Sequence, residues 1–123
     1  MGKKIIEIEL NYHGDGSVIR TAEGAFSGGT IDPKLNDDLR FSVHRQVPDE
    51  NYILNPVPGE DTVEGSFQIN LFGNSAGYRE LGKYFLAIAE LDTSEDPNYH
   101  DHFDDLKSED GRTHLHIIVR KEA

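Results

Sequence analysis

The chain has 123 residues, no cysteine, and 12 basic against 23 acidic residues, which gives a net charge of −11. This length is typical of one domain with a single core, and we expect one domain over residues 1–123. The absence of cysteine excludes disulfides and thiolate metal sites, and the charge argues against nucleic acid as a partner. A macromolecular partner is therefore expected to be basic, unless the charge only maintains solubility.

The start of the chain bears on its location. Lys3 and Lys4 resemble the basic beginning of a signal peptide, but Glu7 and Glu9 interrupt the apolar run that should follow. No segment approaches the ~20 apolar residues that span a bilayer. We therefore expect a cytoplasmic protein with no membrane partner.

The first predicted strand has apolar residues at every second position. Ile6, Ile8 and Leu10 share one face, and the opposite face carries Glu7 and Glu9. A turn containing glycines at residues 13–16 and a β-rich stretch from residue 18 come next. Residues 4–26 therefore predict a β-hairpin.

Two further strands are predicted in the middle of the chain. Alternation of apolar and polar residues covers residues 39–44 and residues 67–71. Prolines, a glycine and acidic residues between them indicate a long loop. Within this loop, Tyr52, Ile53 and Leu54 form an apolar run that is able to pack over the sheet edge.

One amphipathic helix is predicted from about Ser75 to Leu91. Asn74 or Ser75 is a suitable N-cap, because either side chain can accept a bond from a free amide of the first turn. Gly82 falls on the same face as Phe85 and is expected to let the helix approach the sheet closely. The apolar positions recur at spacings of three and four: Tyr78, Leu81, Phe85, Ile88 and Ala89.

The last predicted strand runs from Thr113 to Lys121. Its apolar side, formed by Leu115, Ile117 and Val119, is expected to pack against the helix. Four or five strands and one principal helix predict an α+β fold of two layers. In this fold the helix packs on one face of a mainly antiparallel sheet.

The stretch from Glu90 to Asp110 holds nine carboxylates and a single basic residue. It connects the helix to the last strand, and its composition predicts a loop. Such dense like charge destabilises the chain locally, so either neighbouring groups offset it or a partner uses it.

Four of the six histidines form two His-x-His pairs, which suggests a metal site. Residues two apart on a strand point to the same face, so such a pair can present two imidazole nitrogens to one ion. The candidate ligands for zinc or another divalent metal are His100, His102, Asp104, His114 and His116. Alternatively, these side chains are solvated or attracted to acidic neighbours, and no cofactor is bound.

The run His114–Arg120 also invites comparison with the histidine-triad nucleotide hydrolases. Ile118 stands where the next alternating histidine is needed, and no glycine loop suited to a phosphate is found. The nucleophile and its electrostatic support are therefore both missing. We predict no catalytic residue.

The C-terminal half carries a recurrent pattern: a strand ending in Gly-Asn, a helix, an acidic histidine-containing segment and a hydrophobic last strand. In this pattern it resembles the immunity proteins of bacterial polymorphic toxin systems. The resemblance implies a non-catalytic inhibitor that binds a toxin stoichiometrically and covers its active site or an adjacent surface. The residues that carry it are Gly73, Asn74, Gly77, Leu81, Ala87, Ile88, Ala89, His100, Asp101, His102, Ile117, Ile118 and Val119.

The function therefore has alternatives of different classes. The first is an acidic module whose segment 92–110 binds a basic protein, such as a toxin, and the second is a small metal-binding domain or metal-dependent enzyme. A third leaves the acidic segment merely solvated. For the first, the expected contacts are the carboxylates and two aromatic anchors of the segment: Asp96, Tyr99, Asp101, Phe103, Asp104 and Asp105.

The sequence leaves open the role of the two aromatic residues and the oligomeric state. Tyr99 and Phe103 are equally suited to anchoring the segment to the protein's own core. The chain is expected to be a monomer or a weak homodimer, because strand edges permit sheet extension while Lys3 and Lys4 discourage it.

Overall fold

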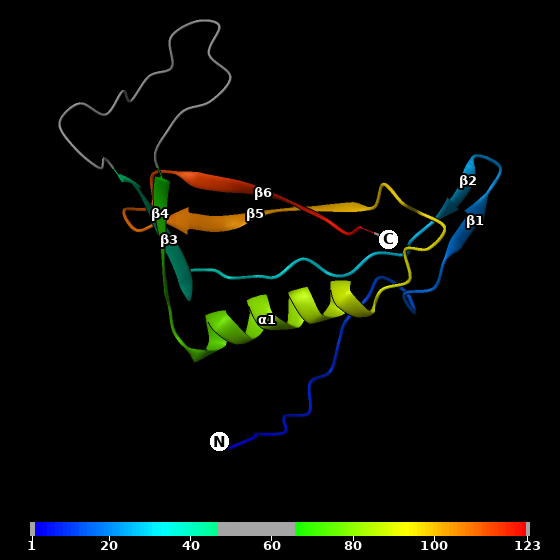
Figure 1. Ribbon diagram of the computed structural model, residues 1–123, viewed down its shortest axis with the longest axis horizontal. Coiled ribbons are helices and arrows are strands. Elements are labelled where there is room, and N and C mark those ends of the chain that lie inside the picture. The colour runs from blue at the N-terminus through cyan, green and yellow to red at the C-terminus, as the bar shows by residue number, and fades with distance from the viewer. Residues whose placement is uncertain (1, 47–65, 123) are drawn as a thin grey trace, which may run out of the picture.

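The computed structural model describes residues 2–46 and 66–122, and in these residues it has two β-sheets and one helix (Figure 1). A small antiparallel hairpin precedes a four-stranded sheet of order β4-β3-β5-β6. The predicted packing of Tyr52, Ile53 and Leu54 lies outside the described residues. The elements are β1 (Ile19–Thr21), β2 (Gly24–Phe26), β3 (Leu39–Gln46), β4 (Ser66–Gly73), α1 (Ser75–Glu90), β5 (His100–Ser108) and β6 (His114–Arg120).

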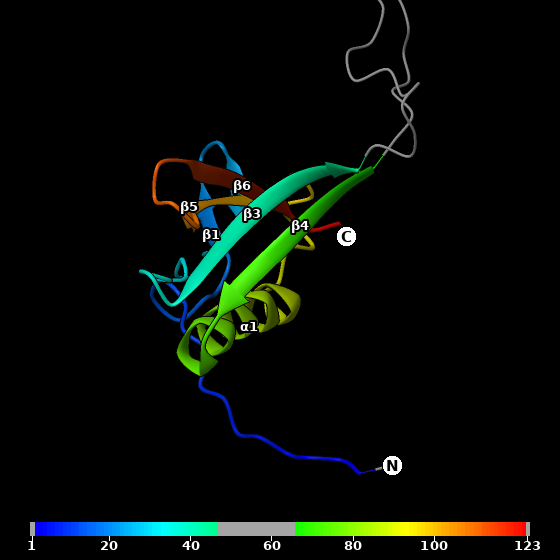
Figure 2. The same cartoon turned by 90° about the vertical axis from the view of Figure 1, so that its left-hand side faces the viewer.

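The larger sheet consists of two antiparallel pairs that meet over a short parallel contact. β3 and β4 pair from Leu39 opposite Gly73 to Gln46 opposite Ser66. β3 and β5 pair only at Arg40 and Phe41. The β3–β4 hairpin therefore leaves β5 and β6 at a steep angle, as Figure 1 shows, and Figure 2 displays the hairpin along its length.

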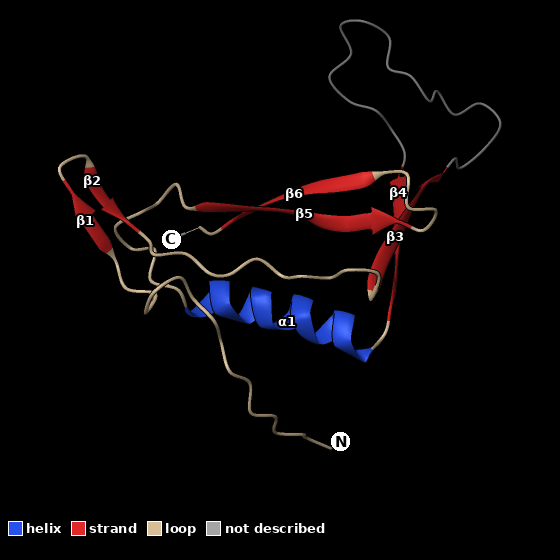
Figure 3. Cartoon of the chain, turned by 180° about the vertical axis from the view of Figure 1, so that it is seen from behind, coloured by secondary structure: helices blue, strands red, loops and turns tan. Residues whose placement is uncertain are grey.

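The core lies between α1 and the sheet, as the view from behind in Figure 3 makes plain. The apolar side of β6 packs against this core, as its alternation predicts. The predicted α+β fold with a mainly antiparallel sheet is confirmed. The buried members of the core are Leu35, Leu39, Phe41, Tyr84, Ile88, Phe103 and Leu106.

Residues 28–38 form an extended connection that runs between α1 and β5 (Figures 1 and 3). Its Leu35 is fully buried. The backbone N–H groups of Leu35 and Asn36 donate to the carboxylate of Asp105 on β5, at 2.6 and 2.9 Å. This connection therefore contributes Leu35 to the core and is fixed to β5 through Asp105.

Asn74 and Asp38 hold the start of α1 against the start of β3. The Asn74 side chain accepts a bond from Gly77 N–H at 2.9 Å and donates to the Asp38 carboxylate at 2.7 Å. Asn74 is thus the N-cap, one of the two residues that the sequence suggests.

Lys121 closes the other end of α1. Its Nζ donates to the carbonyl oxygens of Ile88, Ala89 and Leu91 at 3.0, 2.9 and 2.6 Å. A cation here satisfies carbonyls that have no partner within the helix and complements the negative end of the helix dipole.

The strand predicted around Ile6 and Ile8 is wrong, and the hairpin predicted over residues 4–26 is reduced to β1 and β2. Residues 2–10, called the arm below, form no strand, and residues 6–9 of the arm lie beside the outer side of α1. The chain instead bridges Tyr12 to Thr30, and the Tyr12 hydroxyl donates to Ala87 O at 2.9 Å. Period-two alternation is present in the arm, but a strand also needs a neighbouring strand with free backbone groups.

The close approach predicted at Gly82 is also wrong. A Cβ at Gly82 would meet no atom within 4 Å, whereas a Cβ at Gly77 would overlap the backbone carbonyl of Asp38. Gly77 is buried, and Phe85 is 48% exposed. The core side of α1 therefore follows Gly77, Tyr84 and Ile88. Leu81 and Ile88 of the predicted face pack on the core, but Tyr78, Phe85 and Ala89 are exposed, so the core side is rotated partly away from the predicted face.

The loop predicted for the acidic segment is replaced over much of its length by β5. Phe103 and Leu106 pair with Ile117 and Leu115 of β6, and the register shifts between them. At this irregularity two residues of β5, Asp104 and Asp105, stand opposite the single residue His116 of β6, so β5 contains one extra residue between its two buried apolar positions. Alternation is hidden in the sequence because carboxylates occupy several of the strand positions.

Candidate functional site

Groups inside the fold offset much of the charge between Glu90 and Asp110. The Asp96 carboxylate accepts a bond from Ser27 N–H at 3.1 Å. Asp105 accepts the two amide bonds from residues 35 and 36 described above. Asp101 accepts a bond from the Tyr84 hydroxyl at 2.5 Å. Three of the carboxylates predicted as partner contacts therefore form hydrogen bonds within the protein. Asp101 and Asp105 join β5 to α1 and to residues 35 and 36, and Asp96 joins the segment before β5 to Ser27.

The two aromatic residues predicted as anchors lie in the protein's own interior. Tyr99 is 8% exposed and Phe103 is 2% exposed. The Phe103 ring meets the Tyr84 ring edge-on, with centroids 5.0 Å apart. Their placement agrees with the alternative in which they anchor the segment to the core.

Asp104 differs from these residues because its side chain is 60% exposed. Its carboxylate lies 3.3 Å from Nδ1 of His116 on the adjacent strand. Of the six predicted contacts, Asp104 is the one whose carboxylate remains open to an incoming protein.

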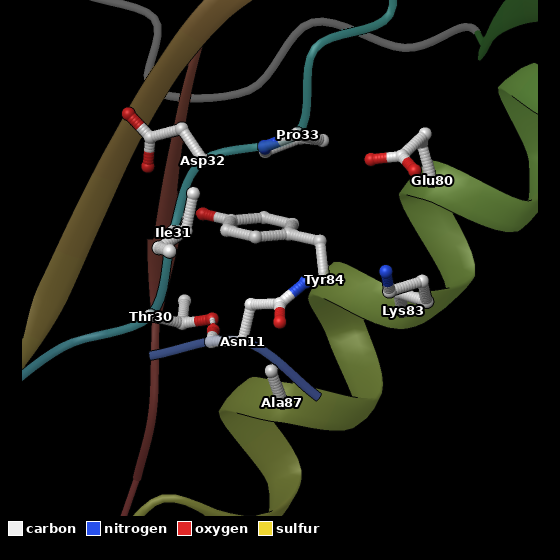
Figure 4. A pocket seen from close by; sticks show the side chains of 9 residues that line it. All are labelled: Asn11, Thr30, Ile31, Asp32, Pro33, Glu80, Lys83, Tyr84 and Ala87. Carbon is white, nitrogen blue, oxygen red and sulfur yellow. Dashed lines mark hydrogen bonds between the residues drawn. The ribbon is translucent and has the colours of Figure 1, made fainter. Parts of the chain in front are cut away.

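A small pocket lies between α1 and residues 30–33 (Figure 4). The Tyr84 ring crosses its centre, and Lys83 and Glu80 stand at its helical side. Its volume is about 40 Å³. Because small-molecule sites occupy roughly 300 to 1,000 Å³, this pocket has room for water but not for an organic substrate.

Asp32, Asp101 and Tyr84 form a polar group beside this pocket. Partial burial raises the pKa of the Asp32 carboxyl to about 7, and hydrogen bonding to Asp101 and the charges of Asp101 and Asp104 add to the shift. Burial, followed by the bond to Asp101, also raises the pKa of the Tyr84 hydroxyl. Asp32 therefore takes up a proton more readily in the folded chain than in the unfolded chain.

This shift predicts how stability changes with pH. The pKa of Asp32 rises on folding from 3.8 to about 7. Its contribution to the free energy of unfolding is therefore fully present below pH 3.8 and is lost as pH rises through 7. Asp32→Asn should therefore raise the free energy of unfolding at pH 8 by about 1 kcal/mol, a value reduced for the solvent exposure of Asp32. Urea unfolding at pH 4 and pH 8 measures this difference, which should nearly vanish at pH 4.

Asp37→Asn is the matched control, because Asp37 is an exposed carboxylate in the same connection. It should leave the pH dependence unchanged. Equal effects of the two substitutions at pH 8 would show that Asp32 has no special proton affinity.

The structure brings the candidate metal ligands onto the outer side of β5 and β6 without forming a cluster. The rings of His100 and His102 lie with centroids 5.0 Å apart, and His116 contacts Asp104. His114 lies at the far end of β6, opposite Lys107. Within residues 2–46 and 66–122, no three His, Asp or Glu side chains are grouped closely enough to hold a metal ion. The metal site stays a prediction.

Sequence reasoning did not anticipate Asp32 or Tyr84 as members of a polar group. Asp32 is in a connection and Tyr84 is on the helix, and both meet Asp101 on β5. No local pattern links these positions. Only the buried placement of residues 28–38 between α1 and β5 brings the three together.

Comparison with known proteins bears on the part of the chain that contains α1, β5 and β6. Residues 68–121 match the family model of Immunity protein 32. The resemblance to immunity proteins that the C-terminal half predicts is thereby confirmed. Comparison with curated proteins and with solved structures gives no match.

The Immunity protein 32 match covers somewhat less than half of the chain. It takes in nearly all of β4, the whole of α1, β5 and β6, and Lys121 at the end of the helix. β3 and the β1–β2 hairpin lie before it. In the described part of the chain, no helix is long and apolar enough to cross a membrane.

Proposed function

We propose that this protein is a cytoplasmic bacterial immunity protein that neutralises a basic toxin by binding it stoichiometrically. The observation that carries the proposal is the match of residues 68–121 to Immunity protein 32. That region contains three of the four strands of the larger sheet and the helix, and therefore most of the core.

The charge of the chain supports a basic partner. At a net charge of −11, the protein attracts a cationic surface over long distances and accelerates its association at low ionic strength. Asp92 adds to this field as an exposed carboxylate whose pKa is lowered by its bonds to Ser94. Screening by salt should slow the association, because the Debye length is about 8 Å at physiological ionic strength.

Asp104 is the first candidate contact on this surface. It is exposed, it lies on the outer side of the sheet, and it is not committed to a backbone amide. The other predicted contacts are held in place by burial or by hydrogen bonds within the protein and support the segment that carries Asp104. They are Asp96, Tyr99, Asp101, Phe103 and Asp105.

The direct test is protection from toxicity. The proposal predicts that a toxin domain is encoded beside this gene, and this domain is expressed in bacteria with and without the present protein. The proposal predicts that growth stops with the toxin alone and recovers on co-expression. Continued growth arrest, with both proteins present at equal amounts, would contradict it.

A charge substitution tests the surface within the same complex. Asp104→Lys should lower the association rate constant for that toxin domain about tenfold at low salt, because a steering charge is reversed. Stopped-flow mixing at several salt concentrations measures the rate constant, and the difference should shrink as salt increases.

Glu23→Lys is the matched control. Glu23 is exposed in the turn between β1 and β2, and the substitution changes the net charge by the same amount. It should alter the rate constant less than Asp104→Lys does. Equal slowing by both would indicate that net charge alone governs association and would remove Asp104 from the contact surface.

A further inference from the structure

The arm exposes an apolar and basic stretch. Ile5 is 95% exposed and Ile6 is 63% exposed, and the preceding Lys3 and Lys4 are also exposed. The arm forms no strand, and Tyr12 fixes its base to α1. Four neighbouring side chains that combine a hydrophobic surface with two positive charges are unusual in a chain with this excess of acid.

A complementary hollow lies in the corner between β3 and the turn that joins β5 to β6. Its volume is about 620 Å³, and Phe41, Val43 and Leu115 supply its apolar floor. Val43 is 46% exposed. Two carboxylates, Glu109 and Asp110, stand at its rim.

The rim is held in place by hydrogen bonds. Glu109 N–H donates to Phe41 O at 2.9 Å, which joins the turn to β3. The Asp110 carboxylate accepts bonds from Ser108 Oγ at 2.6 Å and Arg112 N–H at 3.0 Å, and these bonds lower the pKa of Asp110. Arg112 belongs to the same turn but does not line the hollow.

We propose that the hollow binds the arm of a second copy of this chain, with Ile5, the more exposed of the two isoleucines, on the apolar floor and Lys3 and Lys4 beside the two rim carboxylates. The arm and the hollow match in hydrophobicity and in charge. Within one molecule the arm extends on the side of α1 that faces away from β5 and β6 (Figures 1 and 2). Reciprocal exchange of the two arms closes the pair as a two-fold symmetric dimer.

Sedimentation velocity from about 10 μM to about 1 mM tests this dimer, because these concentrations bracket weak association. The wild-type protein should shift from monomer to dimer as concentration rises. Ile5→Ser should raise the dimer dissociation constant at least about tenfold, since each arm then loses a buried aliphatic side chain. A wild-type protein that stays monomeric throughout would overturn the proposal.

Charge reversal identifies the contact itself. Lys3→Glu with Lys4→Glu should raise the dissociation constant about tenfold, and so should Glu109→Lys, because each places like charges together. Combining the three substitutions should recover part of the affinity that Lys3→Glu with Lys4→Glu removes, because Glu109→Lys returns one opposite charge to the rim while Asp110 stays negative. Asp110 is left unchanged because it holds the turn.

Lys34→Glu and Glu23→Lys are controls at exposed positions outside the arm and the hollow. They should leave the dissociation constant unchanged. If the arm and rim substitutions leave the dissociation constant unchanged, another surface mediates association. The same conclusion follows if the combined variant recovers none of the lost affinity. The measurement uses the protein without any toxin, so its outcome is independent of the proposed immunity function.

Discussion

Tyr84→Ala is expected to lower the free energy of unfolding by about 4 kcal/mol, because large aromatic truncations in a core cost about 3 to 5 kcal/mol. Tyr84 is 2% exposed and lies between α1 and β5. The substitution removes its packing against Phe103 and its hydrogen bond to Asp101 together. Since small domains are stable by only about 5 to 15 kcal/mol, equilibrium urea unfolding should show a large shift of the midpoint.

Tyr84→Phe separates the two contributions. It keeps the ring and removes only the hydroxyl that donates to Asp101, so the loss should be about 1 to 2 kcal/mol. If the alanine variant were destabilised no more than the phenylalanine variant, the ring would not be part of the core.

Gly77→Ala is expected to cost about 2 to 3 kcal/mol, as overpacking at a tight contact does. The new methyl group would overlap the carbonyl of Asp38 and press on Leu39, at the place where α1 meets the start of β3. The helix would have to shift and strain the Asn74 cap. Urea unfolding and the intensity of the helical circular dichroism signal measure the change.

Gly82→Ala in the same helix is the matched control and should have the opposite sign. A Cβ at Gly82 meets no atom within 4 Å, so only helix propensity changes. The variant should gain about 0.5 to 1 kcal/mol, because alanine is favoured over glycine inside a helix. A similar loss at both glycines would contradict the rotated helix face described above.

The elements whose signals are local could be predicted from the sequence. The observed bounds of β3, β4, α1 and β6 are close to the predicted ones. Apolar residues recur at every second position in these strands and at every third or fourth position in the helix, and both patterns depend only on residues near one another in the sequence. The N-cap at Asn74 follows from the same local chemistry. The resemblance carried by these elements also agrees with the match of residues 68–121.

β5 could not be predicted because its carboxylates are satisfied by distant groups. The backbone amides of Leu35 and Asn36, which donate hydrogen bonds to the Asp105 carboxylate, lie about 70 positions earlier in the chain. The Tyr84 hydroxyl performs the same task for Asp101. Without these partners, the acidic composition indicates a solvated loop, whereas Phe103 and Leu106 of this segment belong to the core.

In the arm, by contrast, the sequence predicts a strand that does not form. Ile6 and Ile8 alternate as in a strand, yet their exposed fractions are 63% and 43%. Alternation fixes which side chains share a face but does not provide a neighbouring strand. In the arm the pattern therefore marks apolar residues that the fold leaves partly exposed, and not a member of the sheet.

Calorimetric titration, with this protein, of the toxin domain that the proposal expects beside this gene tests the immunity function most directly. Toxin activity is assayed at each addition of the protein. The proposed function predicts a saturable complex at a fixed ratio and complete loss of toxin activity once that ratio is reached. Absence of a complex, or toxin activity that persists at saturation, would contradict it.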